Sequence, residues 1–400
     1  MSGPFDGKRV LLGVSGSIAA YKAIDIASKL TQAGAIVNVL MSPAATHFVT
    51  PLTFRSMTHQ DVVTDLFDLH SRQAIEHVAL AKDADVLVVA PATAHTIAKL
   101  ALGLADDPIT VTALATSAPL VIAPAMDANM WHHPAVRANA DLLVSRGATI
   151  IGPGEGRLAS GLMGWGRLAE TPEIIGAIAT ALGAHGDLAG RTIVVSAGGT
   201  QEAIDPVRVI TNRSSGKMGY AIAEAARDRG ASVVLVTAPT SLDEPSGVDT
   251  RHVESASDML SAVLSACEGA DAVIMAAAVA DYTPTHPAAD KVKKSATDEL
   301  SVHLTKTVDI LSATPRNLVR VGFAAESTNL IRYAQTKLEA KALDFIVAND
   351  ITVPDSGFGA DTNKVTIVSH EGVEDLPMMS KYGVAVEILD RIVARLAAKR

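Results

Sequence analysis

Short apolar runs alternate with longer segments of helical spacing along this chain, a pattern that predicts an α/β protein. The runs are rich in valine, isoleucine and leucine, as expected for parallel sheets buried on both faces. Among the expected helices, one spans residues 172–182 and another closes the chain at 381–398. The expected strands are residues 10–14, 36–41, 85–90, 120–123 and 149–151, then 192–196, 232–237, 272–277, 319–324, 345–348 and 364–368.

One strand–turn–helix–strand unit occurs near the N-terminus and again near the middle of the chain. In both copies a glycine, Gly34 or Gly230, ends the helix before a valine-rich strand. Such a glycine is typical of a crossover helix that leads into the next parallel strand. The repeat predicts two nucleotide-type α/β domains in series, and therefore suggests two reactions.

The length of 400 residues also suits two domains better than one core. Residues 183–190, GAHGDLAG, have the composition of a linker, so we expect domains at 1–186 and 187–400. The predicted fold is two Rossmann-like three-layer α/β domains with mostly parallel sheets.

Two segments are expected to lack regular structure. Residues 152–168 hold six glycines, which suits either a mobile flap over a site or an ordinary surface loop. Residues 281–298 are rich in proline, lysine and aspartate and are expected to form a loop.

Composition excludes several classes of function. The net charge is -9 and the longest basic block is residues 291–294, so we expect no nucleic-acid partner. Polar residues and prolines interrupt every long apolar run, and we expect neither a membrane span nor a signal peptide. Cys267 is the single cysteine, which excludes an intramolecular disulfide and a cysteine-rich metal site. A cytoplasmic enzyme is the expected class.

The loop after the first strand has the composition of a phosphate site. Gly13 and Gly16 allow backbone N–H groups to approach a phosphate, and Ser15 and Ser17 offer hydroxyl donors. The loop is not GxGxxG, and the second strand ends at Ser42 without an acidic residue for a ribose. A mononucleotide such as FMN therefore fits better than a dinucleotide, and a plain tight turn is the alternative.

Longer motifs carry a resemblance to known families. Residues 13–22, 90–94 and 124–131 resemble motifs of the flavin-dependent cysteine decarboxylases. Motifs of the second half resemble phosphopantothenate–cysteine ligase, at 205–208, 210–219, 277–282, 291–294, 322–326 and 348–351. In this order they resemble the bifunctional bacterial coenzyme A enzymes over almost the whole chain. The resemblance implies a flavodoxin-like FMN domain followed by a CTP-binding ligase domain.

For the first half, the resemblance implies FMN-dependent removal of CO₂ from an N-acyl cysteine. Loss of CO₂ leaves a carbanion. Prior oxidation of the thiol to a thioaldehyde lets this carbanion delocalise as an enethiolate, and the reduced flavin later returns the electrons. His77 is implied in proton transfer, although by its type alone it would be taken for a surface histidine. The implied cofactor-binding residues are Gly13, Ser15, Gly16, Ser17, Ser42, Pro91, Ala92, Thr93, Ala94 and Met126.

Two further residues implied in catalysis depart from the family pattern. Asp127 stands where the motif Pro-x-Met-Asn-x-x-Met-Trp has asparagine, and an ionised aspartate accepts hydrogen bonds without donating. Ser160 stands where some members have a flap cysteine, and a hydroxyl cannot replace thiol chemistry at neutral pH. Cys267 belongs to the other domain and is a poor substitute.

For the second half, the resemblance implies that 4′-phosphopantothenate is activated by CTP as an acyl-cytidylate, which the amine of cysteine then attacks. Asn212 and Lys291 are the implied catalytic residues, and Asp281 is the implied Mg²⁺ ligand. Lys337 and Lys341 are spaced i, i+4 and so share one helical face, where a phosphate could bind. The implied substrate- and CTP-binding residues are Gly198, Gly199, Thr200, Ala277, Ala278, Asp281, Phe323, Lys337 and Lys341.

Two alternatives remain open from the sequence. The ligase could be active beside an impaired or altered flavin domain, because of Asp127 and Ser160, or the chain could be a non-catalytic flavin-binding regulatory subunit. The resemblance also implies homo-oligomers, with trimers formed through the flavin domain and dimers through the ligase domain, possibly combined as a dodecamer.

Overall fold

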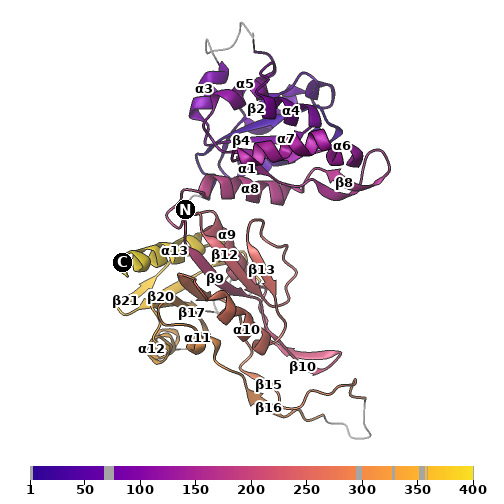
Figure 1. Ribbon diagram of the computed structural model, residues 1–400. Helices are drawn as coiled ribbons and strands as arrows, with labels where there is room; N and C mark the ends of the chain where they lie inside the picture. The colour runs from indigo at the N-terminus through magenta and orange to yellow at the C-terminus, as the bar shows by residue number, and fades with distance from the viewer. Residues whose placement is uncertain are drawn as a thin grey trace. The chain divides into compact units, whose positions relative to one another are not determined.

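The computed structural model describes residues 3–66, 76–293, 300–326, 329–350, 356–357 and 359–399. The chain forms two compact units, residues 1–184 and 185–400, which are described separately (Figure 1). The division falls close to the expected boundary between residues 186 and 187.

Unit 1 is built on a six-stranded parallel sheet with strand order β3-β2-β1-β4-β5-β6. Its strands, including a separate hairpin β7–β8, are β1 (Arg9–Val14), β2 (Ile36–Met41), β3 (Val62–Val63), β4 (Val86–Ala92), β5 (Leu120–Pro124), β6 (Thr149–Ile150), β7 (Gly154–Arg157) and β8 (Met163–Arg167). Its helices are η1 (Ile18–Tyr21), α1 (Lys22–Gln32), η2 (Ala45–His47), α2 (Pro51–Thr58), α3 (Glu76–Asp83), α4 (Ala94–Leu102), α5 (Pro108–Ala115), α6 (Ala128–His132), α7 (Pro134–Ser145) and α8 (Thr171–Gly183).

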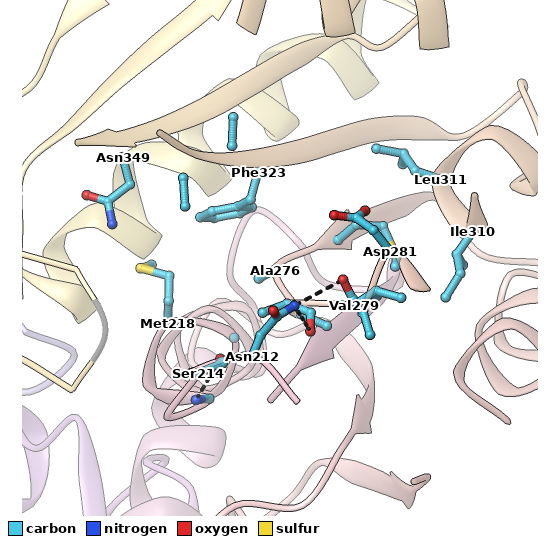
Figure 2. A pocket seen from close by; sticks show the side chains of 18 of the residues that line it. Asn212, Ser214, Met218, Ala276, Val279, Asp281, Ile310, Leu311, Phe323 and Asn349 are labelled. Atoms are coloured by element: carbon cyan, nitrogen blue, oxygen red, sulfur yellow. Dashed lines mark hydrogen bonds between the residues drawn. The ribbon is translucent and has the colours of Figure 1, made fainter. Parts of the chain in front are cut away.

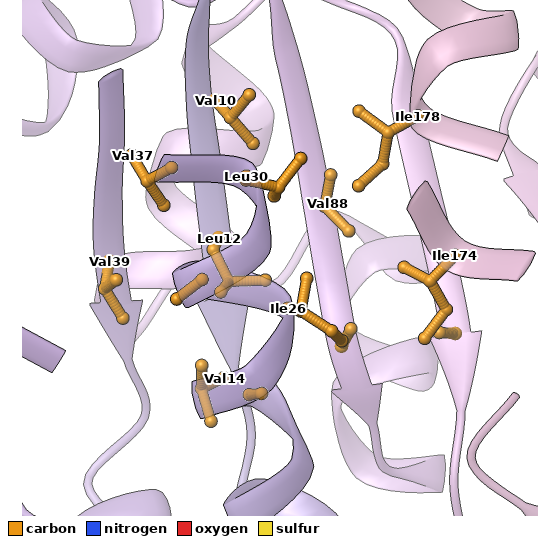
Figure 3. Close-up of a cluster of buried hydrophobic side chains, with 14 of the residues drawn as sticks. Val10, Leu12, Val14, Ile26, Leu30, Val37, Val39, Val88, Ile174 and Ile178 are labelled. Carbon is orange, nitrogen blue, oxygen red and sulfur yellow. The ribbon is translucent and has the colours of Figure 1, made fainter. Parts of the chain in front are cut away.

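Both faces of this sheet are buried under helices. Val10 and Leu12 of β1 pack with Ile26 of α1 and Ile174 of α8, as Figure 3 shows. Leu11, between them in sequence, points to the other face and belongs to a cluster with α4 and α5. Because strand side chains alternate between faces, uninterrupted apolar strands require helices on both sides. The result is the expected three-layer arrangement.

Unit 2 repeats this arrangement around an eight-stranded sheet with order β13-β12-β9-β14-β17-β18-β20-β21, antiparallel only at its β18–β20–β21 end. The strands of the sheet are β9 (Thr192–Ala197), β12 (Ser232–Thr237), β13 (Asp249–His252), β14 (Ala272–Met275), β17 (Val319–Glu326), β18 (Phe345–Asp350), β20 (Val365–Ser369) and β21 (Gly372–Asp375). Three strand pairs lie outside it: β10 (Gln201–Asp205) with β11 (Arg208–Thr211), β15 (Tyr282–Pro284) with β16 (Leu304–Lys306), and β19 (Thr362–Asn363) with β22 (Met379–Ser380).

The helices of unit 2 also lie on both faces of its sheet. Ile193 and Val195 of β9 pack with α9 and α13, whereas Val194 packs with α10 and α12. The helices are α9 (Lys217–Arg227), α10 (Ala256–Ala266), α11 (Ile310–Ala313), α12 (Leu330–Lys341) and α13 (Lys381–Ala398).

The predicted fold class is confirmed: both units are α/β layers with mostly parallel sheets. Gly34 and Gly230 follow α1 and α9 in the left-handed conformation, with φ of 92° and 87°, as the glycine stops required. Two expectations about irregular segments are wrong in part. Residues 152–168 contain the hairpin β7–β8, and within the segment 281–298 residues Tyr282–Pro284 form β15, while residues 294–298 lie outside the described residues. The hairpin β10–β11 was not expected at all.

Candidate functional site

A cavity of about 800 Å³ lies in unit 2, at the carboxyl ends of β14, β17 and β18 and the start of α9 (Figure 2). This is the edge of an open α/β sheet where ligands usually bind. Its lining is rich in cations and holds few carboxylates, which favours an anionic ligand. The charged residues that line it are Arg213, Lys217, Asp281, Lys306, Asp309, Lys337, Lys341 and Lys381.

Asn212 is held at this cavity by two hydrogen bonds. Its Nδ2 donates to the carbonyl oxygens of Ala278 and Val279, each at 3.2 Å (Figure 2). The side chain is therefore oriented before any ligand arrives. Ala277 and Ala278, both predicted, line the same stretch of wall.

The predicted residues Gly198, Gly199 and Thr200 stand behind that wall. The N–H of Ala278 donates to the carbonyl of Gly198 at 2.8 Å, and the N–H of Ala280 donates to Thr200 Oγ1 at 2.9 Å. Thr200 is fully buried. These residues shape the wall of the cavity and are absent from its described lining.

The helix α12 brings Lys337 and Lys341 to the cavity together, as their spacing predicts. Lys337 Nζ donates to the carbonyl of Phe323 at 2.7 Å, and Phe323 itself lines the cavity (Figure 2). Lys341 Nζ lies 2.8 Å from Asp309 Oδ2. Partial burial opposes the charge of Asp309, but hydrogen bonds from Lys341 and Ser312 outweigh it and lower the pKa of this carboxyl.

Three lysines at this site were missed, and one of them, Lys306, is exposed at the end of β16. Lys217 opens α9 and reaches Asp361 Oδ1 at 2.7 Å. Lys381 opens α13, is buried and donates to the carbonyl of Gly357 at 3.0 Å. Burial, together with the nearby charge of Lys217, lowers the pKa of Lys381. Lys217 lies inside the quoted motif 210–219 and could have been selected, whereas the sequence around Lys381 carries no such signal.

The two remaining predicted residues of unit 2, Asp281 and Lys291, do not lie at the same site. Asp281 lines the cavity, but Lys291 is exposed and is absent from the described lining. The neighbouring N–H of Val292 donates to Asp205 Oδ2 at 3.0 Å, so this segment lies against the hairpin β10–β11. Among the described residues, no group of three His, Cys, Asp or Glu side chains could hold a metal ion.

In unit 1 the predicted phosphate loop lies at the β1–β4 switch point, where the strand order reverses. Ser15 is buried, and its hydroxyl donates to the carbonyl of Pro91 at 2.7 Å and accepts from the N–H of Thr93 at 3.0 Å. Ser17 Oγ accepts from the N–H of Ala19 and caps η1. The Ser15 hydroxyl therefore joins the loop after β1 to the loop after β4, and the Ser17 hydroxyl shapes the turn into η1.

The structure brings the remaining predicted cofactor residues to the same sheet edge. The N–H of Ser42 donates to the carbonyl of Val14 at 3.1 Å. Pro91 and Ala92 end β4, while Thr93 caps α4, which begins at Ala94. The N–H of Met126 donates to the carbonyl of Gly166, which ties the segment after β5 to the hairpin β7–β8.

The predicted catalytic residues of unit 1 are described in part. His77 belongs to α3, but its side chain lies outside the described residues, so its role stays a prediction. Asp127 caps α6: its Oδ1 accepts from the N–H of Asn129 at 3.0 Å. Ser160, at the tip of the hairpin, donates to Asp127 Oδ2 at 2.8 Å. The two departures from the family pattern are thus in contact with each other.

Cys267 lies in unit 2, where it is buried, and burial raises the pKa of its thiol to about 11. Burial and the raised pKa make this thiol poorly suited to thiol chemistry. No helix in the described ranges combines the length and apolar character that crossing a membrane requires.

Two family models match the chain in succession. One, described as "Flavoprotein", matches residues 2–183, and the other, "DNA/pantothenate metabolism flavoprotein C-terminal domain", matches residues 188–396. A crystal structure of the C-terminal domain of a coenzyme A biosynthesis bifunctional protein CoaBC is 44% identical, with a TM-score of 0.46. It covers 53% of this chain and 98% of its own.

Full-length relatives share both halves. The coenzyme A biosynthesis bifunctional protein CoaBC of Bacillus subtilis (strain 168) is 48% identical, over 97% of this chain and 97% of its own length. The protein of the same name from Escherichia coli (strain K12) is 40% identical, over 98% of each. With that identity extending across both units, the chain belongs to the CoaBC family of bifunctional coenzyme A biosynthesis proteins.

Proposed function

We propose that this chain catalyses two consecutive steps of coenzyme A synthesis. Unit 2 joins 4′-phosphopantothenate to cysteine at the expense of CTP, and unit 1 decarboxylates the product to 4′-phosphopantetheine with FMN. The observation that carries this proposal is the cation-lined cavity of unit 2, which contains Asn212 of the ligase motifs together with Lys337 and Lys341 of α12. A non-catalytic flavin-binding subunit is not favoured, because the full-length relatives are bifunctional enzymes.

The ligase reaction places many negative charges in one cavity. The carboxylate of phosphopantothenate attacks the α-phosphate of CTP, pyrophosphate leaves, and the amine of cysteine then displaces CMP from the acyl-cytidylate. Lys337 and Lys341 stabilise charge on the phosphates, and the amide of Asn212 orients the acyl group. Phe323 offers its ring to the pyrimidine, and Lys291 reaches the substrate from its exposed segment.

Mg²⁺ is the expected partner of the CTP phosphates. Asp281 is the cavity carboxylate best placed to hold it, since Asp309 is paired with Lys341. A site with one or two carboxylates fits Mg²⁺, which typically takes its other ligands from water and nucleotide phosphates.

The β1–β4 switch point of unit 1 fits FMN. A Cβ added at Gly16 would lie 2.4 Å from Ala44 Cβ, so the loop after β1 packs against Ala44 with no room for a side chain at position 16. Bound there, FMN would supply the two-electron oxidation and reduction that the decarboxylation needs. His77 exchanges the proton of the substrate thiol or carboxylate, and Asp127 and Ser160 position the reacting end.

Exposed apolar side chains on the two hairpins of unit 2 support an interface between copies of the chain. Val207 and Val209 are 62% and 39% exposed, and Tyr282 and Leu304 are 47% and 44% exposed. Because β10 contacts β15, these exposed apolar side chains lie on adjoining hairpins, and apolar exposure over adjoining strands is typical of an interaction surface. We assign dimers to this unit and trimers to unit 1, in a cytoplasmic enzyme, and sedimentation of each expressed half would test the assignment.

The ligase half is tested by following CMP. Purified protein with Mg²⁺ and CTP should release CMP only when both phosphopantothenate and cysteine are present. Replacing CTP by ATP measures the nucleotide preference in the same assay. Release of CMP that does not depend on cysteine would contradict the amide-forming step.

A further inference from the structure

The hairpin β7–β8 runs along the segment after β5 and is joined to it by two hydrogen bonds. At its base, the N–H of Met126 donates to the carbonyl of Gly166 at 3.0 Å. At its tip, Ser160 Oγ donates to Asp127 Oδ2 at 2.8 Å. Between these points, a Cβ added at Gly164 would lie 3.1 Å from Ala128 Cβ, so the two backbones run close together.

The two carboxylate oxygens of Asp127 have different partners. Oδ1 accepts from the N–H of Asn129 and caps α6, while Oδ2 accepts from Ser160. Asparagine is an equally good cap, so the capping bond does not by itself require a carboxylate. Aspartate differs from asparagine in its second oxygen. In the ionised carboxylate this oxygen accepts hydrogen bonds and cannot donate them.

The residue type at position 160 matters because of that second oxygen. A hydroxyl stays protonated beside a carboxylate and donates to it. A thiol in the same place would have its ionisation opposed by the negative charge, whereas an amide would not oppose it. Aspartate at position 127 is therefore compatible with serine at position 160, and asparagine at position 127 is compatible with a reactive cysteine at position 160.

We propose that Asp127 and Ser160 form a matched pair of positioning residues, in which the Ser160 hydroxyl latches the tip of the hairpin β7–β8 onto the Asp127 carboxylate. The contact itself does not depend on the proposed function. Only its purpose rests on that function, and this purpose is to hold the hairpin over the segment that meets the substrate. The two departures from the family pattern are then one coupled change. This chain positions the hairpin with a hydrogen bond and uses no thiol there.

The contact is tested by titrating a thiol placed at position 160. The variant Ser160→Cys is compared with Ser160→Cys/Asp127→Asn, and iodoacetamide alkylation of the full-length protein is followed as a function of pH. Cys267, the single native cysteine, is buried with a raised pKa, so wild-type protein gives the blank.

We expect the thiol to titrate about one pH unit higher beside Asp127 than beside asparagine, so it should react about tenfold more slowly near neutral pH. Other titratable groups on the packed elements, His132 and His133 at the end of α6 and Glu155, Arg157 and Arg167 on the hairpin, are the same in both proteins and cancel. Ser160→Cys/Asp141→Asn, which changes an exposed carboxylate of α7, should react like Ser160→Cys. Equal alkylation rates with aspartate and with asparagine at position 127 would overturn the pairing.

The latch is tested by trypsin, which can cleave after Arg157 and Arg167 of the hairpin. We expect Ser160→Ala to be cleaved there severalfold faster than wild type, and Ser160→Thr, which keeps the hydroxyl, to match wild type. Equal cleavage of all three proteins would overturn the latch. Both assays are run without substrate, so a failure of the proposed function in a turnover assay would leave their results readable.

Discussion

The two candidate sites meet their ligands with different parts of the chain. The cavity of unit 2 is lined by lysine side chains that arrive from α9, β16, α12 and α13. The predicted cofactor residues of unit 1 are uncharged, and the hydroxyls of Ser15, Ser17 and Thr93 are bonded within the chain. A site lined by charged side chains, as in unit 2, loses one contact with each substitution. A site shaped by its loops, as in unit 1, loses its ligand when the loops change shape.

We attribute the difference to the charge of the proposed ligands. CTP and phosphopantothenate bring several phosphates and a carboxylate together, and only cations can offset their repulsion. A flavin mononucleotide has one phosphate and a large planar ring, so it needs backbone donors and narrow loops. The comparison predicts that the halves can be disabled separately and by different kinds of substitution.

The largest expected effect separates the halves through proton transfer. His77→Asn should lower the rate of decarboxylation by about 10²- to 10⁴-fold, the usual contribution of a general acid or base. Ligation should be unchanged, because His77 belongs to unit 1. Product identification by mass spectrometry checks this, with phosphopantothenoylcysteine accumulating. Loss of both activities would show that the halves are not independent.

The next largest effect should impair ligation and leave decarboxylation intact. Lys337→Ala should reduce kcat/KM for ligation by about 10²- to 10³-fold, because it removes a cation from the phosphates in the transition state. Decarboxylation of added phosphopantothenoylcysteine should not change. Lys364→Ala, at an exposed lysine of the same unit, is the control and should behave as wild type in both assays.

The proposed flavin site of unit 1 should be disturbed by the addition of a single methyl group at Gly16. Gly16→Ala would place a Cβ 2.4 Å from Ala44 Cβ and 3.0 Å from its carbonyl carbon. Such overpacking costs about 1–3 kcal/mol, and the loop must move to relieve it. We expect protein that purifies with less flavin and keeps its ligase activity. Gly3→Ala, with nothing within 4 Å of the added Cβ, should retain its flavin.

The smallest effect concerns the hairpin β10–β11. The Arg208 guanidinium, helped by the N–H groups of Val207 and Val292, holds the pKa of Asp205 well below its usual range. A depressed pKa stabilises the fold above the unfolded value of about 4, and that stability is lost as pH falls through the lower, folded value. Urea midpoints should therefore fall less between pH 5 and pH 3 for Asp205→Asn than for wild type. Parallel curves would contradict the assignment.

Sequence reasoning was most successful where the signal was local. The helix expected at residues 381–398 is α13, and the glycine stops at Gly34 and Gly230 have the backbone conformation that the repeat required. The hairpin at 154–167 was missed because glycine and arginine give no alternation of apolar and polar residues. Its strands are defined by pairing with each other.

Parts of the sites that depend on distant contacts were also missed. Lys381 joins the cavity because Gly357 and Thr362 fold back over it, which no local pattern reports. The hydroxyl of Ser15, expected to face a phosphate, instead bridges β1 and β4. Asp127 and Ser160 were each noted as departures, but their contact spans 33 positions and needed the structure.

The most direct test of the account is the stoichiometry of the complete reaction. Purified protein with its flavin is supplied with CTP, Mg²⁺, 4′-phosphopantothenate and cysteine, and CMP, CO₂ and the thiol product are measured together. The account predicts equal amounts of CMP, CO₂ and 4′-phosphopantetheine. Formation of CMP with phosphopantothenoylcysteine or an oxidised, decarboxylated thiol as the end product would contradict a functional Asp127–Ser160 flavin unit, and the absence of CMP would contradict the ligase assignment itself.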